Sequence, residues 1–143
     1  MKTLNNFDEK IEKYFKENEI VFNQNYLLLF PKVKFNFWKH SLMDINDDFK
    51  KIIVILFNTR DIEIFSCELK FSLSGMEVEK IGEVWEKIAR NDLKNFKLKK
   101  KLIGYEIFIE KGKFENTYKF SKSYKKDYWF NKNFEYLKEN DLI

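Results

Sequence analysis

The sequence predicts an α+β domain: a mainly antiparallel sheet of about five strands with helices packed on it. Apolar residues recur at helical spacing in three segments and at strand spacing in most of the others. The chain has 143 residues and is 44% hydrophobic, which is enough for one core without disulfides or metals. We therefore expect residues 1–143 to form a single globular domain with the element order α-βββ-α-ββ-α.

The N-terminal segment has the pattern of an amphipathic helix over about residues 5–18. Asn6 and Glu9 stand at the spacing of a capping pair, in which the glutamate reaches back to the start of the helix. Charged residues separate the apolar positions, so one face is expected to be buried and the other solvated. The apolar face comprises Leu4, Phe7, Ile11, Tyr14 and Phe15.

From Tyr26 the spacing changes to that of strands. The segment from Tyr26 to Phe37 begins as a continuous apolar run and alternates after Pro31. This pattern predicts either one strand bent near the proline or two short strands, because proline cannot donate to a sheet ladder.

The next segments predict two more strands joined by a turn. The run IIVILF at residues 52–57 is apolar throughout, which is typical of a central strand covered on both faces. Residues 58–61 (NTRD) are expected to turn. The strand predicted over residues 62–73 changes its apolar phase between Ile64 and Phe65, and either a bulge or burial of both faces would explain the change.

Residues 74–93 show the clearest helical spacing in the chain, and we predict the second helix there. Ser74 and Glu77 have the pattern of a capping box at its start. The apolar stripe of this helix comprises Val78, Ile81, Trp85, Ile88 and Ala89, with Val84 beside it.

The C-terminal third predicts a hairpin and a short helix. Alternating residues from Ile103 to Ile109 indicate a strand that includes Gly104, and Lys111-Gly112 marks a tight turn, because glycine takes the positive φ that such turns need. The returning strand covers residues 114–120. A C-terminal helix is predicted from the spacing of Phe130, Phe134 and Leu137.

Charge and targeting patterns narrow the classes of partner. The net charge is +4, but the chain has only two arginines, which phosphate-binding proteins favour for their bidentate geometry. Its abundance of Lys, Asn, Ile and Phe fits a low-GC, bacterial or mobile-element genome, so lysine richness partly reflects codon supply. The N-terminus lacks the apolar core of a signal peptide, and no apolar run is long enough to span a bilayer. We expect a cytoplasmic protein with no membrane partner.

Few residues are candidates for catalysis or metal binding. His40 is the sole histidine, which excludes a site built on paired histidines, and we interpret it as a surface residue at a strand end. Cys67 is the sole cysteine, and its place among alternating apolar residues favours a buried hydrophobic role over a nucleophilic one. The acidic loop DINDD (residues 44–48) lacks the glycine turn and downstream glutamate of a calcium loop. We therefore expect no enzymatic activity, no cofactor and no metal.

Protein binding is the function that the remaining residues favour. Most aromatic residues fit a core, including Phe35 and Phe37 on the expected buried face. Aromatic residues outside that pattern would serve as interface anchors, and the acidic loop would contact a basic partner. The predicted partner-binding residues are Trp38, His40, Asp44, Asp47, Asp48, Tyr128 and Trp129.

Three stretches and the element order resemble a known family. The stretches are VWEK at residues 84–87, EKGKF at 110–114 and YWFNKNFEYL at 128–137. In these the chain is similar to the YezG-like family of bacterial immunity proteins, which neutralise polymorphic toxins that are often nucleases. The resemblance implies an antitoxin whose partner is a cognate protein toxin encoded nearby, blocked by occlusion of its active site. The basic charge differs from that of typical inhibitors of basic nucleases, which are acidic.

An alternative function is a small nucleic-acid-binding protein of phage or mobile-element origin. It rests on the stretch KNFKLKKK, which would contact nucleic acid through Lys94, Phe96, Lys97, Lys99, Lys100 and Lys101. The same stretch also has a structural interpretation. It follows the second predicted helix, and its alternation leads into the strand LIGYEIFIE, where lysines would form a solvated face and guard the sheet against edge pairing.

Overall fold

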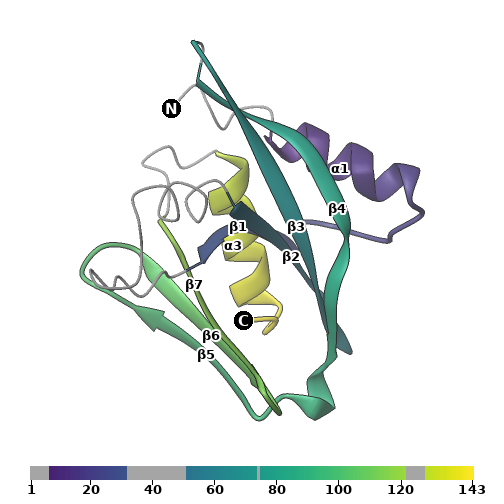
Figure 1. Ribbon diagram of the computed structural model, residues 1–143. Coiled ribbons are helices and arrows are strands. Elements are labelled where there is room, and N and C mark those ends of the chain that lie inside the picture. Colours follow the sequence, from purple (N-terminus) through teal and green to yellow (C-terminus); the bar gives the residue numbers. More distant parts are fainter. Residues whose placement is uncertain (1–6, 32–50, 74, 122–127) are drawn as a thin grey trace.

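The computed structural model describes residues 7–31, 51–73, 75–121 and 128–143. In these residues the chain forms two α-helices and seven strands of one sheet, in the order β4-β3-β2-β1-β7-β6-β5 (Figure 1). All neighbouring strands are antiparallel. The α+β class is confirmed, whereas the expected number of strands was too low.

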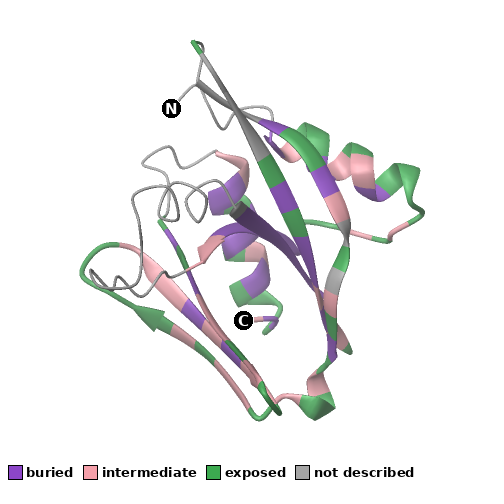
Figure 2. Ribbon diagram, in the orientation of Figure 1, coloured by how far each residue is buried: buried purple, intermediate pink, exposed green. Residues whose placement is uncertain are grey.

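β2 (Lys51–Phe57) lies between β1 and β3 and is buried on both faces (Figure 2). Its residues 52–57 are all 5% exposed or less. On one face Val54 is the register partner of Phe65 in β3 (Asp61–Ser72), whose ring contacts α1. On the other face the Phe57 ring lies 6.3 Å from that of Phe96 in β5 (Asn95–Lys100). The prediction of a doubly covered central strand is confirmed.

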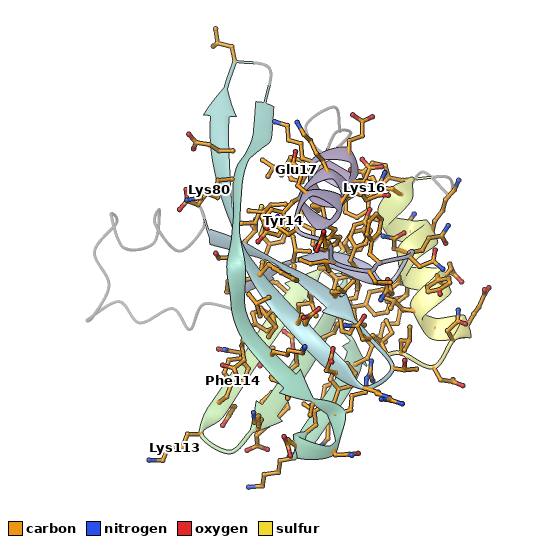
Figure 3. The ribbon with its side chains drawn as sticks, turned by 90° about the vertical axis from the view of Figure 1, so that its right-hand side faces the viewer. Tyr14, Lys16, Glu17, Lys80, Lys113 and Phe114 are labelled. Carbon is orange, nitrogen blue, oxygen red and sulfur yellow. The ribbon has the colours of Figure 1, made fainter. Side chains whose placement is uncertain are left out.

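α1 (Phe7–Glu17) lies across β3 and β4, on the same side of the sheet as α3 (Trp129–Glu139) (Figure 3). The Phe15 ring is 5.5 Å from Phe65 and 5.7 Å from Tyr26, so it joins the helix to two strands. Both terminal helices were predicted from their apolar spacing and are confirmed. Their buried apolar residues are Phe7, Ile11 and Phe15 in α1 and Phe130, Phe134 and Leu137 in α3.

The segment that was predicted to be the second helix is a strand, β4 (Gly75–Ala89), so the prediction over residues 74–93 is wrong. β4 pairs with β3 along its whole length and is followed by a short 3-10 turn (Arg90–Asp92). The register between the strands shifts at three places, and at each place β4 has one residue more than β3. The extra residues widen the spacing of the apolar positions and give a strand the apparent period of a helix.

Burial of both faces explains the phase change seen in β3, and one of the bulges of β4 lies opposite it. The register shifts between Ile64 and Phe65, and β3 continues without interruption against β2. A bulge was one of the two explanations considered for the phase change, and one does occur at this position, but its extra residue belongs to β4 and leaves the alternation of β3 intact. Both Ile64 and Phe65 are fully buried, so β3 is also covered on both faces there.

The lysine-rich stretch forms a strand of its own. β5 pairs with β6 (Tyr105–Lys111) in a hairpin, whereas we expected it to lead into that strand. Gly104, expected inside a strand, lies in the connecting turn at φ +77°, where its carbonyl accepts from the Lys101 amide. A Cβ at Gly104 would press on the Phe120 carbonyl of β7 (Phe114–Phe120). The second hairpin, with Gly112 at φ +55°, is confirmed.

β1 (Tyr26–Pro31) joins two halves of the sheet through a short seam. Residues 26–29 pair with β2, whereas only Phe30 and Pro31 pair with β7. The halves spread apart beyond this seam (Figure 1). The continuation of the predicted strand over residues 32–37 lies outside the described residues.

Candidate functional site: a groove between the two helices

The predicted partner-binding residues fall into two groups. Trp38, His40 and the three aspartates of the acidic loop (Asp44, Asp47 and Asp48) lie outside the described residues. Tyr128 and Trp129 are described, at the start of α3, and both are half-buried. The structure therefore locates a candidate site through these two aromatic residues.

Tyr128 and Trp129 line a groove of about 610 Å³ between α1, α3 and the segment that leads into β1. Acidic side chains reach it from α1, amides from residues 23–24 and α3, and one lysine from α3. Phe22 and Tyr26 add aromatic surface. The groove is lined by Asp8, Glu12, Phe22, Asn23, Gln24, Tyr26, Tyr128, Trp129, Lys132 and Asn133.

The aromatic side of the groove is held by ring contacts. The Trp129 indole stacks on Tyr26 at 5.8 Å between centroids with 27° between the planes, and Tyr128 lies 5.8 Å from Trp129. Tyr26 also contacts Phe15 and Phe22, so the stack is anchored in the core. Trp129 is thus positioned before any partner arrives, which lowers the entropic cost of binding through it.

Burial and the acidic side chains of the groove set the protonation state of Tyr26. The Tyr26 hydroxyl donates to Glu12 Oε2 at 2.8 Å. Burial, the hydrogen bond to Glu12 and the nearby carboxylates raise the pKa of Tyr26 far above its usual value. The phenol therefore keeps its proton, and Glu12 keeps a fixed hydrogen-bond donor on the groove's inner wall.

Two buried polar atoms of the groove have no hydrogen-bond partner among the described residues: Asp8 Oδ1 and the Tyr128 hydroxyl. Burial raises the pKa of Tyr128, its contact with the Trp129 side chain lowers it, and the charge of Asp8 raises it by a smaller amount, so the Tyr128 phenol lies within the electrostatic reach of the Asp8 carboxylate. Buried polar groups in folded proteins are almost always paired. A ligand that brings a donor for the carboxylate and an acceptor for the phenol would satisfy both.

The chemistry of the groove is that of recognition. Among the described residues, its lining offers carboxylate and amide groups, phenol groups and an ammonium group. Lys132, Asn23 and Gln24 are exposed at the rim, where they add adaptable polar contacts. Such a combination of rigid aromatics and polar groups suits a peptide segment or side chain rich in N–H donors.

The carboxylates of the groove were missed by the sequence interpretation, which placed them on the solvated face of the first helix. Asp8 and Glu12 stand four positions apart, a spacing that puts both on the same side of a helix. This four-residue spacing was the one sign in the sequence that the two carboxylates could share a site. Nothing local shows that Tyr26 and Trp129, more than a hundred residues apart in the chain, lie against each other.

The lysine-rich stretch is the exposed edge of the sheet. β5 is an edge strand, Lys97 and Lys99 are exposed on it, and Lys94 lies 4.0 Å from Glu110. The Phe96 ring packs between Phe57 and the Arg90 guanidinium, which is 5.9 Å from its centroid. Phe96 thus contributes to packing in this structure, and the lysines form the solvated edge.

Cys67 is buried at 2% exposure, and burial raises the pKa of its thiol to about 12. The thiolate is therefore scarce at neutral pH, and the interpretation as a buried hydrophobic residue is confirmed. Among the described residues, no three His, Cys, Asp or Glu side chains gather closely enough to hold a metal ion.

None of the helices in the described ranges has the length and apolar character needed to cross a membrane. Comparison of the chain with protein-family models, with curated proteins and with solved structures finds no match in any of the three.

Proposed function

We propose that this chain is a non-enzymatic binding protein of the immunity type, which neutralises a cognate protein toxin by occluding the toxin's active site. The observation that carries the proposal is the groove between α1 and α3. It combines a pre-positioned tryptophan with two buried polar atoms that have no partner among the described residues.

The packing of Trp129 and the burial of Asp8 Oδ1 support this use of the groove. Tryptophan and tyrosine contribute most to binding when they sit on rigid, well-packed ground, as Trp129 does on Tyr26. Asp8 Oδ1, which has no hydrogen-bond partner among the described residues, adds specificity, because a binding partner must bring a donor to it or leave it unsatisfied. The toxin as partner comes only from the resemblance of three short stretches to the YezG-like family, because the expected element order, which also carried that resemblance, differs from the observed one, in which VWEK lies in β4.

Co-expression with the product of the adjacent upstream gene tests the proposal. We expect the two proteins to elute as one complex and this chain to restore the growth of cells that express the toxin. Trp129→Ala should weaken the complex by about thirtyfold or more, as loss of a hot-spot residue does. Lys132→Glu, at the exposed rim of the same groove, tests the site without touching its packing.

Lys113→Ala is the matched control, because Lys113 is exposed at the β6–β7 turn, far from the helices (Figure 3). Its complex should have the affinity of the wild type. The absence of any complex and of any protection from the toxin would rule out the immunity function. A complex that Trp129→Ala and Lys132→Glu both leave unchanged would instead rule out the groove as its interface.

A further inference from the structure

The β5–β6 turn presents two aliphatic side chains entirely to solvent. Leu102 is 102% exposed and Ile103 is 84% exposed, although both belong to residue types that normally pack inside. The turn lies at one end of the sheet, remote from α1, and Figure 2 shows it as exposed. Two adjacent, fully exposed aliphatic residues at a convex tip form a small apolar knob that packs against nothing in the described structure.

Lysines surround this knob. Lys97, Lys99, Lys100 and Lys101 precede it on β5 and in the turn, and all four are exposed. In the sheet, Glu106 of β6 is the register partner of Lys99 on β5 and of the exposed Lys119 on β7. Glu106 also lies 3.5 Å from Lys101. Among the described residues, five lysines thus stand against one glutamate, which leaves a positive collar beside the apolar tip.

The composition of the tip distinguishes among anionic partners. Nucleic acid offers phosphates for the lysines but no apolar phase for Leu102 and Ile103, and its binders use aromatic rings to stack on bases. Protein interfaces favour aromatic residues and arginine and are depleted of lysine. A lipid interface accepts both groups, because aliphatic side chains enter the acyl boundary while lysine ammonium groups reach up to the headgroups.

We propose that the β5–β6 turn is a membrane-docking tip, which inserts Leu102 and Ile103 into the interface of an anionic phospholipid bilayer while the surrounding lysines bind the headgroups. The expectation of no membrane partner rested on the lack of a spanning segment, whereas this contact is peripheral and reversible, since two aliphatic side chains give only shallow insertion. Each lysine near an anionic surface strengthens binding about fivefold. Binding therefore depends on the anionic lipid and weakens with salt, and it is independent of the α1–α3 groove.

Co-sedimentation with vesicles tests this proposal. The wild-type chain should bind vesicles of phosphatidylcholine mixed with phosphatidylglycerol and should not bind phosphatidylcholine alone. Raising salt from about 0.1 M to about 1 M should release it, because the screening length falls from about 10 Å to about 3 Å. The double variant Leu102→Ser/Ile103→Ser should bind at least about tenfold more weakly, and Lys99→Gln/Lys100→Gln about 25-fold more weakly.

Leu73→Ser supplies the control. Leu73 is 111% exposed at the β3–β4 turn, so its replacement removes an equally exposed leucine that has only one lysine, Lys70, within five positions in the sequence. This variant should bind like the wild type. Failure of the wild type to bind anionic vesicles would overturn the proposal. So would full binding by the Leu102→Ser/Ile103→Ser variant, or tighter binding of the wild type to single-stranded DNA than to the vesicles.

Discussion

Cys67 shows how burial fixes the chemistry of a single residue. Its register partners are Ile52 in β2 and Ile81 in β4, so the thiol lies among apolar side chains in the middle of the sheet. The alternating pattern of β3 was sufficient to predict this. The groove residues were not equally predictable: Tyr128 and Trp129 were identified as aromatic residues outside the core pattern, whereas Asp8 depends on a tertiary neighbour that no local pattern reveals.

The raised pKa of Cys67 predicts a loss of stability at alkaline pH. The thiol ionises near pH 9.0 in the unfolded chain and near pH 12 in the folded one, so its contribution is complete below pH 9 and is lost as pH rises toward 12. At pH 10 the loss is on the order of 1 kcal/mol. Urea unfolding should show that the stability deficit of Cys67→Ala relative to wild type shrinks by this amount between pH 7 and pH 10. A deficit that does not change with pH would contradict the burial of the thiol.

At the scale of elements, β4 shows why a strand was taken for a helix. Val78, Ile81, Val84 and Ile88 pair with Leu69, Cys67, Phe65 and Ile62, respectively. Successive pairs advance by two, two and three residues on β3 but by three, three and four on β4. The second series is the spacing of a helical face. The spacing of apolar residues identifies a strand only where the strand has no bulge. The three bulges of β4 therefore hid its strand pattern, whereas β2 and the two terminal helices were predicted correctly.

α1 stabilises the bulged strand by binding its carbonyl groups. Lys10 Nζ donates to the Val78 carbonyl at 2.9 Å, and the Tyr14 hydroxyl donates to the Gly82 carbonyl at 2.8 Å. Both carbonyls lie beside register shifts, where a bulge disrupts the ladder and leaves backbone groups unpaired. The helix thus supplies donors where the ladder is interrupted.

Tyr14→Phe should therefore lower the free energy of unfolding by about 1 kcal/mol, because it leaves the Gly82 carbonyl without its donor. Hydrogen exchange should accelerate first at the amides of β4 near Gly82. Tyr136→Phe is the control, since the Tyr136 hydroxyl makes an exposed hydrogen bond with Asn23 and should cost much less. Equal stability losses in the two variants, with no local change in β4, would show that α1 does not support the bulges.

At the scale of the whole molecule, two half-sheets are connected by few direct pairs. The seam consists of Phe30 and Pro31 against β7, and other contacts reinforce it. The Arg90 guanidinium donates to the Asn58 carbonyl at 2.7 Å and to the Leu142 carbonyl at 2.9 Å while it lies over Phe96. It thus joins the first half-sheet, the segment after α3 and β5. Helical spacing predicted α3 itself, but its position at the seam depends on contacts distant in sequence.

Asn133 holds α3 at that seam. The Asn25 carbonyl accepts from Phe57 of β2, so the next carbonyl, that of Tyr26, points away from β2 toward the edge that β7 leaves unpaired. Asn133 Nδ2 donates to this carbonyl at 3.0 Å, in a place where Asn133 is only 4% exposed. The buried amide of Asn133 therefore completes the ladder of β1.

Asn133→Ala should lower the free energy of unfolding by about 1–3 kcal/mol, because it leaves the buried Tyr26 carbonyl without a partner. The effect should reach both halves of the sheet, so hydrogen exchange should accelerate in β1 and in β7 together, while α1 keeps its protection. Asn140→Ala is the matched control: its side chain bonds the Tyr136 carbonyl at an exposed position and should cost little. If Asn133→Ala were no more destabilising than Asn140→Ala, the two half-sheets would be held together by packing and by the Arg90 contacts, without the bond from α3 to β1.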